Sequence, residues 1–151
     1  MNLTPKQTKL HDTILKEHSD EIYVQGSVQS GKTYVIAFSL IEYTRKVFEY
    51  DPNTKYNGAI VGWDLDTLKG NIVDVIQNFM NEEFNYTKGT DYELKFGGND
   101  KYFEFLNMRY YFFGFNTKLS FNKILGKPLL FVWIDESARI YSNSRITKFI
   151  R

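Results

Sequence analysis

Apolar residues recur at intervals of three and four positions in several stretches of the sequence. This spacing predicts amphipathic helices over residues 4–18, 34–48, 65–83 and, less extensively, 144–150. Thr4 is placed to cap the first helix and Pro5 to begin it. Asp51-Pro52-Asn53 supplies the turn chemistry that ends the second helix.

Between these helices, short apolar and alternating runs predict strands. A short strand is predicted over 21–25, and continuous apolar runs over 58–62 and 129–134 predict strongly buried strands. Alternating runs, expected to pair antiparallel, cover 92–96, 102–106 and 109–115. The strand–helix–strand–helix order implies parallel strands with right-handed crossovers and helices on both faces of the sheet. The inserted hairpin region makes the sheet mixed. We expect an α/β fold in a single domain, residues 1–151.

Composition excludes several classes of protein. The 151 residues carry 19 Lys and Arg against 18 Asp and Glu, a net charge of +1, so no global field attracts nucleic acid or an anionic membrane. The chain has no cysteine, which excludes disulfides, thiolate metal sites and a cysteine nucleophile. No apolar run approaches the ~18 residues of a membrane span, and no signal core begins the chain, so no membrane partner is expected.

Residues 26–33 fit the pattern G-x-x-x-x-G-K-[ST], between a predicted strand and a predicted helix. They are Gly26, Ser27, Val28, Gln29, Ser30, Gly31, Lys32 and Thr33. Glycines let the backbone bend around an anion, and N–H groups at a helix N-terminus point at phosphates. The pattern, known as Walker A, predicts ATP binding, with Lys32 on the β- and γ-phosphates and Thr33 on Mg²⁺. The alternative is a Gly/Ser-rich turn that ends in Lys-Thr by chance.

The apolar run 129–134 ends in two acids, Asp135 and Glu136. An apolar strand ending in an acid is the Walker B pattern, in which Asp135 serves the magnesium ion. Glu136 is then placed to orient or deprotonate the water that attacks the γ-phosphate. Two solvated acids at the start of a loop are the alternative interpretation.

Other residues are candidates for contact with adenine and for the positive charge that stabilises the transition state of hydrolysis. The carboxamide of Gln7 is able to pair with N6 and N7 of adenine, although a solvent-facing helix residue is equally compatible with the sequence. The loop contains no arginine, so Arg139, Arg145 and Arg151 are the candidates for an arginine finger, with a surface position as the alternative. From residue 108 onward, eight basic residues stand against two acids, which suits DNA phosphates, a neighbouring subunit or a solvated face.

These motifs together resemble the N-terminal ATPase domain of large terminase subunits, the DNA-packaging motors of tailed bacteriophages. Leu3–Gln7 matches the adenine motif and Gly26–Thr33 the phosphate loop. The run Phe113-Gly114-Phe115…Lys123-Ile124-Leu125-Gly126 and the strand Val132–Asp135 with Glu136-Ser137-Ala138 complete the match over nearly the whole chain.

The resemblance implies a P-loop NTPase fold of the RecA-like (ASCE) type and ATP hydrolysis that drives double-stranded DNA into a procapsid. It implies that Gln7 contacts adenine, that Lys32 and Thr33 contact phosphates and Mg²⁺, that Asp135 contacts Mg²⁺ and that Glu136 is the catalytic base. Its implied partners are DNA, a small terminase subunit and a portal protein, in a homo-oligomeric ring within the bacterial cytoplasm.

Two departures from the family pattern qualify these expectations. Val28-Gln29 stands where many members have an arginine, and the sequence ends at Arg151 before the coupling motif, the C-terminal strands and the nuclease domain. We therefore expect a truncated motor domain that binds Mg·ATP and hydrolyses it poorly alone. A helicase-like DNA-dependent ATPase and a non-catalytic nucleotide-binding or assembly module are the alternatives.

Overall fold

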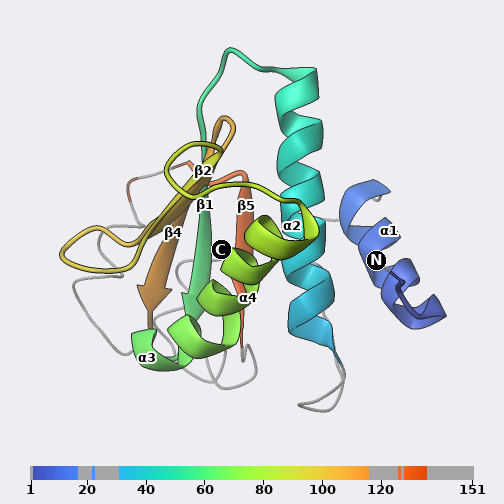
Figure 1. The fold of residues 1–151 in the computed structure, drawn as a ribbon, viewed down its shortest axis with the longest axis horizontal. Helices are drawn as coiled ribbons and strands as arrows, with labels where there is room; N and C mark the ends of the chain where they lie inside the picture. Colours follow the sequence, from blue (N-terminus) through green and yellow to red (C-terminus); the bar gives the residue numbers. More distant parts are fainter. Residues whose placement is uncertain (1, 17–21, 23–30, 116–125, 127, 136–151) are drawn as a thin grey trace.

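Five strands form one sheet in the order β2-β3-β4-β1-β5 (Figure 1). The computed structural model describes residues 2–16, 22, 31–115, 126 and 128–135. The strands are β1 (Tyr56–Gly62), β2 (Tyr92–Lys95), β3 (Tyr102–Phe105), β4 (Met108–Gly114) and β5 (Phe131–Ile134). The helices are α1 (Pro5–Lys16) and α2 (Lys32–Tyr50), followed by α3 (Leu65–Leu68), η1 (Lys69–Val73), α4 (Asp74–Asn78) and η2 (Phe79–Glu83).

The sheet has a parallel core and an antiparallel side. β1 runs parallel to β4 on one side and to β5 on the other, whereas β2, β3 and β4 pair antiparallel. β4 therefore belongs to both parts. The sequence grouped residues 109–115 with the hairpin region, but β4 pairs with all seven residues of β1, from Tyr56↔Met108 to Gly62↔Gly114.

Residues 65–83 form one continuous helical stretch, as predicted, but two of its segments are π-helical turns. Asp64 caps its start by accepting a hydrogen bond from the Thr67 N–H at 2.7 Å. Four of its six buried residues, Leu68, Ile72, Ile76 and Met80, are spaced by four. In a regular helix a four-residue step rotates by about 40° beyond a full turn, and the wider π turns absorb this drift. The apolar face thus stays on the sheet.

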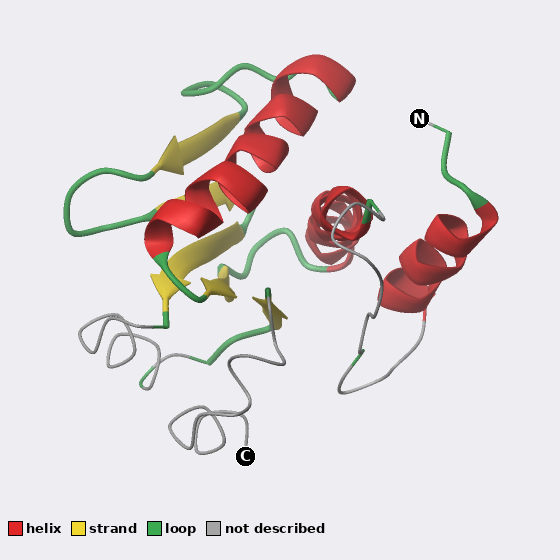
Figure 2. Cartoon of the chain, turned by 90° about the horizontal axis from the view of Figure 1, so that it is seen from below, coloured by secondary structure: helices red, strands yellow, loops and turns green. Residues whose placement is uncertain are grey.

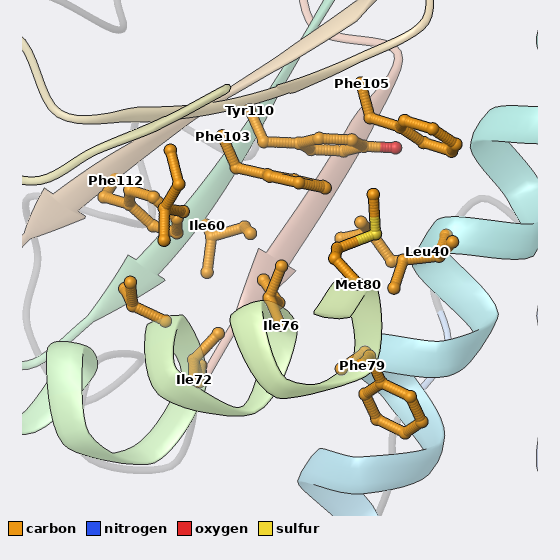
Figure 3. Close-up of a cluster of buried hydrophobic side chains, with 14 of the residues drawn as sticks. Leu40, Ile60, Ile72, Ile76, Phe79, Met80, Phe103, Phe105, Tyr110 and Phe112 are labelled. Carbon is orange, nitrogen blue, oxygen red and sulfur yellow. The ribbon is translucent and has the colours of Figure 1, made fainter. Parts of the chain in front are cut away.

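The main core lies between this helical stretch, α2 and one face of the sheet. Figure 3 shows Ile72, Ile76 and Met80 facing Ile60 of β1 and Tyr110 of β4, with Leu40 of α2 beside them. Tyr110 is fully buried, and its hydroxyl lies 2.8 Å from Thr44 Oγ1 of α2. Because Thr44 already donates to the Leu40 carbonyl, Tyr110 is the donor to Thr44. α2 is therefore hydrogen-bonded to β4.

The opposite face of the sheet carries a smaller cluster of buried residues: Ala59 and Val61 of β1 with Phe113 and Phe115. β5 is the last strand in the described order, and its buried residue is Trp133. The prediction that 129–134 is a strongly buried strand is wrong at two positions, because Leu130 and Val132 are 45% and 39% exposed. Val132 points to the face away from the helices.

α1 packs on α2 on the side away from the sheet, as both ribbon views show (Figures 1 and 2). None of its residues is fully buried. Within the described ranges, no helix is long and apolar enough to cross a membrane. The strand predicted over 21–25, apart from residue 22, and the helix predicted over 144–150 lie outside the described residues.

Candidate nucleotide-binding site

The carboxyl ends of the three parallel strands lie at one edge of the sheet. Gly62 pairs with Gly114, and Val61 pairs with Ile134. Just beyond β5, the Asp135 N–H donates to the Val61 carbonyl at 2.8 Å, which places Asp135 beside the end of β1. The crevice outside the carboxyl ends of the strands is where open α/β sheets bind ligands.

The N-terminus of α2 points to this same edge. In Figure 1, α2 starts at the end of the molecule where the β1 and β4 arrows finish, so it runs opposite to the strands. Midway along, the Tyr43 ring packs on Phe131 of β5 at 5.1 Å. From that contact, four residues of strand extend about 13 Å to Asp135, and ten residues of helix lead back about 15 Å to Thr33. Thr33 and Asp135 therefore lie at the same end of the fold.

Gly31 introduces α2 with a backbone geometry that suits glycine. Its φ is 74°, in the left-handed region, and its carbonyl accepts the Val35 N–H at 3.2 Å. Lys32 and Thr33 follow as the first residues of a 19-residue helix. The first N–H groups of such a helix have no acceptor within the helix and carry partial positive charge. This end of α2 is suited to an anion.

The first turn of α2 is anchored by an aromatic contact. The Tyr34 ring packs on Phe79 of η2 at 4.3 Å. Burial and, secondarily, the nearby Glu83 raise the pKa of the Tyr34 phenol, so it stays neutral at physiological pH. The residues before and after Tyr34 are thus held at the sheet edge without adding negative charge there.

Gln7 has a structural role in addition to the one its sequence position suggested. The Thr4 N–H donates to Gln7 Oε1 at 2.9 Å, and the Gln7 N–H donates to Thr4 Oγ1 at 3.3 Å, which together form a capping box. The other carboxamide atom, Nε2, faces Gly31: a β-carbon at residue 31 would lie 2.7 Å from it. Gln7 is therefore adjacent to the start of α2, with one lone pair of Oε1 engaged in capping.

The structure brings together some of the predicted site residues and does not describe others. Gln7 contacts Gly31, and Lys32, Thr33 and Asp135 lie at the same edge. Outside the described residues lie loop residues 26–30, Glu136 and its neighbours 137–138, residues 123–125 of the third matching run, and the candidate arginines Arg139, Arg145 and Arg151.

Sequence reasoning missed one acid at this edge. Asp64 follows β1 two residues after Gly62, and its carboxylate accepts hydrogen bonds from the Thr67 N–H and, at 2.9 Å, from the Thr67 hydroxyl. The spacing Asp64-Leu65-Asp66-Thr67 at the start of a predicted helix was the available signal, since Asp is a favoured N-cap residue. Among the described residues, no group of three or more His, Asp or Glu is arranged to hold a metal ion.

A sheet with a parallel core, whose carboxyl edge lies at the start of the helix that Gly31 introduces and Lys32 and Thr33 begin, agrees with the P-loop NTPase fold. Comparison with solved structures agrees. The chain is similar to the large terminase from a thermophilic bacteriophage, with a TM-score of 0.73 and 21% identity over 98% of this chain and 36% of that one. The expected resemblance to large terminases is thereby confirmed in the fold.

Two further structures of the same terminase contain nucleotides. The complex with ADP matches with a TM-score of 0.68 and 23% identity, over 97% of this chain and 35% of that one. The complex with ATP-gamma-S matches with a TM-score of 0.63 and 21% identity, over 95% of this chain and 35% of that one. The chain thus spans about a third of the length of the terminase chains it matches. No protein-family model and no curated protein matches the sequence.

Proposed function

We propose that this chain is a Mg·ATP-binding and ATP-hydrolysing motor domain of the large-terminase type. The observation that carries the proposal is the terminase fold over 98% of the chain, seen in a relative solved with ADP and with ATP-gamma-S. The local geometry supports it, because Gly31 introduces α2, and Lys32 and Thr33 begin it, at the sheet edge that carries Asp135.

In this proposal, residues 26–33 enclose the triphosphate. The N–H groups of the loop and of the first turn of α2 bind phosphate oxygens, and Lys32 neutralises the β- and γ-phosphates. The hydroxyl of Thr33 and the carboxylate of Asp135 are hard oxygen donors of the kind that Mg²⁺ prefers, so these two residues fit the ion. Mg²⁺ bound there would neutralise the negative charge that develops on the phosphates.

Glu136 and Gln7 have separate roles on the two sides of the nucleotide. Glu136 orients the attacking water and accepts its proton, so the water oxygen bonds to the γ-phosphorus as the bond to ADP breaks. Gln7 binds adenine through Nε2 and the remaining lone pair of Oε1, while the capping bond to Thr4 persists. Hydrolysis powers translocation of double-stranded DNA, with a small terminase subunit and a portal protein as partners in the cytoplasm of a bacterial host.

Nucleotide binding tests the first part of the proposal. We expect the purified chain to bind ATP-gamma-S in the presence of Mg²⁺ in isothermal titration calorimetry. Lys32→Ala lowers that affinity by at least about tenfold, because a charge-assisted contact worth roughly 1.5–3 kcal/mol is lost. Lys69→Ala is the matched control, since Lys69 is an exposed helix lysine paired only loosely with Asp74 at 3.8 Å. Equal affinities for wild type and Lys32→Ala would contradict the phosphate-loop assignment.

Hydrolysis tests the second part and separates the motor from the alternatives. Glu136→Gln should retain ATP-gamma-S affinity and abolish phosphate release, because the amide cannot accept a proton from water. A chain that binds ATP-gamma-S but releases no phosphate, with or without double-stranded DNA, is instead a non-catalytic nucleotide-binding module. Stimulation by single-stranded DNA alone would favour the helicase-like alternative.

A further inference from the structure

α2 contains two buried hydroxyl groups that link it to its neighbours. Thr44 accepts the Tyr110 hydroxyl, as described above. Ser39 is also fully buried, and its Oγ donates to the Val35 carbonyl at 2.7 Å. The Nδ1 atom of His11, on α1, lies 2.8 Å from Ser39 Oγ. Because the Ser39 hydrogen is already used, Nδ1 must be the donor, which fixes neutral His11 as the Nδ1–H tautomer.

His11 lies one helical turn after Gln7, so both side chains are on the same face of α1. Gln7 contacts Gly31, and His11 contacts Phe38 and Ser39. The contacts occur in the same order along both helices, so α1 and α2 run in the same direction. The His11 ring also stacks on Phe38, with ring centroids 4.9 Å apart. The contacts of His11 with α2, one turn of α1 away from Gln7, therefore determine where Gln7 lies along α2.

We propose that His11 is a positioning residue for adenine recognition: its hydrogen bond to Ser39 holds α1 on α2 so that the Gln7 carboxamide stays beside Gly31. This inference rests on the proposed function, in which Gln7 reads adenine. The effect of His11 reaches the ligand only through Gln7.

The physical argument concerns how α1 is held. No residue of α1 is fully buried, so the hydrophobic contribution to its docking is modest. Under these conditions one hydrogen bond is a sizeable part of what keeps α1 in register. Loss of such a bond lowers the equilibrium constant for docking of α1 by about five- to tenfold. The apparent affinity for a ligand that needs docked Gln7 falls in proportion to the docked fraction, by up to the same factor, while a ligand that needs only the phosphate loop is unaffected.

The experiment compares three ligands on the full chain with Mg²⁺: ATP-gamma-S, GTP-gamma-S and inorganic tripolyphosphate. His11→Phe keeps an aromatic ring to stack on Phe38 but lacks the N–H donor. We expect it to lower ATP-gamma-S affinity by more than about twofold and by up to about tenfold, and to leave the affinities for GTP-gamma-S and tripolyphosphate within about twofold. His11→Asn, whose amide retains a donor near the Nδ1 position, should recover part of the loss. Lys16→Ala is the control on α1, since Lys16 is exposed and pairs with Asp12 of the same helix.

The outcomes separate this inference from the proposed function. If wild type binds no ATP-gamma-S, both fail. If wild type binds ATP-gamma-S but the His11→Phe variant is unchanged, or loses affinity for all three ligands equally, the positioning role is wrong and the nucleotide site stands. A wild type without preference for ATP-gamma-S over GTP-gamma-S also overturns the inference.

Nitrogen-15 NMR of the histidine rings, which distinguishes the tautomers, gives a second measurement. It uses the wild-type chain without ligand and does not depend on whether a variant folds. We expect Nδ1 of His11 to carry the proton. The Nε2–H tautomer in the neutral ring would overturn the hydrogen bond to Ser39 and with it the inference.

Discussion

Gly58, in the middle of β1, allows the Tyr110 ring to lie across the strand. A β-carbon at residue 58 would be 2.5 Å from Tyr110 Cδ1, 2.7 Å from Cε1 and 3.0 Å from the Phe131 carbonyl oxygen. Carbon atoms in contact prefer about 3.5–4.0 Å, so Gly58→Ala requires a shift of about 1 Å. The ring has little freedom to move, because it is fully buried and its hydroxyl is bonded to Thr44.

We expect Gly58→Ala to destabilise the fold by about 2–4 kcal/mol. Overpacking in a filled core costs roughly 1–3 kcal/mol, and displacement of the ring weakens a hydrogen bond worth about 1 kcal/mol. The assay is urea unfolding followed by tryptophan fluorescence. Gly70→Ala is the control, because Gly70 is exposed within a helical segment and a β-carbon there meets nothing within 4 Å. That change should stabilise the chain by about 0.5–1 kcal/mol. If the two variants shift the midpoint in the same direction by similar amounts, the packing argument for Tyr110 is refuted.

Three further predictions concern α1 and α2. Gln7→Glu should keep the capping box, because Glu is equally suited to that position, but weaken ATP-gamma-S binding by about fivefold through loss of the Nε2 donor; unchanged calorimetric affinity would count against adenine contact. Arg45 lies over the Phe84 ring at 4.4 Å and donates to the Tyr86 hydroxyl at 2.6 Å, so Arg45→Lys should lower the free energy of unfolding by about 1 kcal/mol in urea titrations. Burial lowers the pKa of His11 below 6.5, against the opposing effects of Asp12 and Glu42. Stability should therefore fall as the pH drops below about 6.5, and His11→Phe should flatten that dependence between neutral pH and about pH 5.

The helices were the most predictable part of the fold because their apolar spacing extends over many residues. The run 65–83 specified a helix, and Leu68, Ile72, Ile76 and Phe79, which follow its helical spacing, are buried. The π turns were not foreseen, because one four-residue spacing is compatible with a regular helix. Only when the spacing repeats three times along the sheet does the drift become too large for a regular helix.

Strand pairing was harder to predict because it depends on residues distant in sequence. β4 alternates like a hairpin strand, yet its seven residues also pair in parallel with β1. Nothing local in the sequence distinguishes these two pairings. The burial of Leu130 and Val132 was overestimated for a related reason, since an apolar run reports hydrophobicity and not the position of the strand within the sheet.

For the candidate site, the sequence identified residue types better than their geometry. Gly31, Lys32, Thr33 and Asp135 were selected from spacing alone, and the described residues lie at a common edge of the sheet. The capping role of Gln7 was missed although Thr4 had been assigned as the N-cap, because Glu or Gln three residues after the N-cap completes a capping box. His11 carried no sequence signal of its own, since its partner Ser39 lies 28 positions away.

The shallow burial of α1 has a consequence for the dynamics of the chain. Elements with few buried contacts open locally at a lower free energy than the core, so amide hydrogens of residues 8–16 should exchange with solvent well before those of β1 and β4. A ligand that contacts Gln7 binds only the form in which α1 is docked on α2, so the bound ligand slows amide exchange throughout α1. Slower amide exchange in α1 would then indicate that the nucleotide site is occupied.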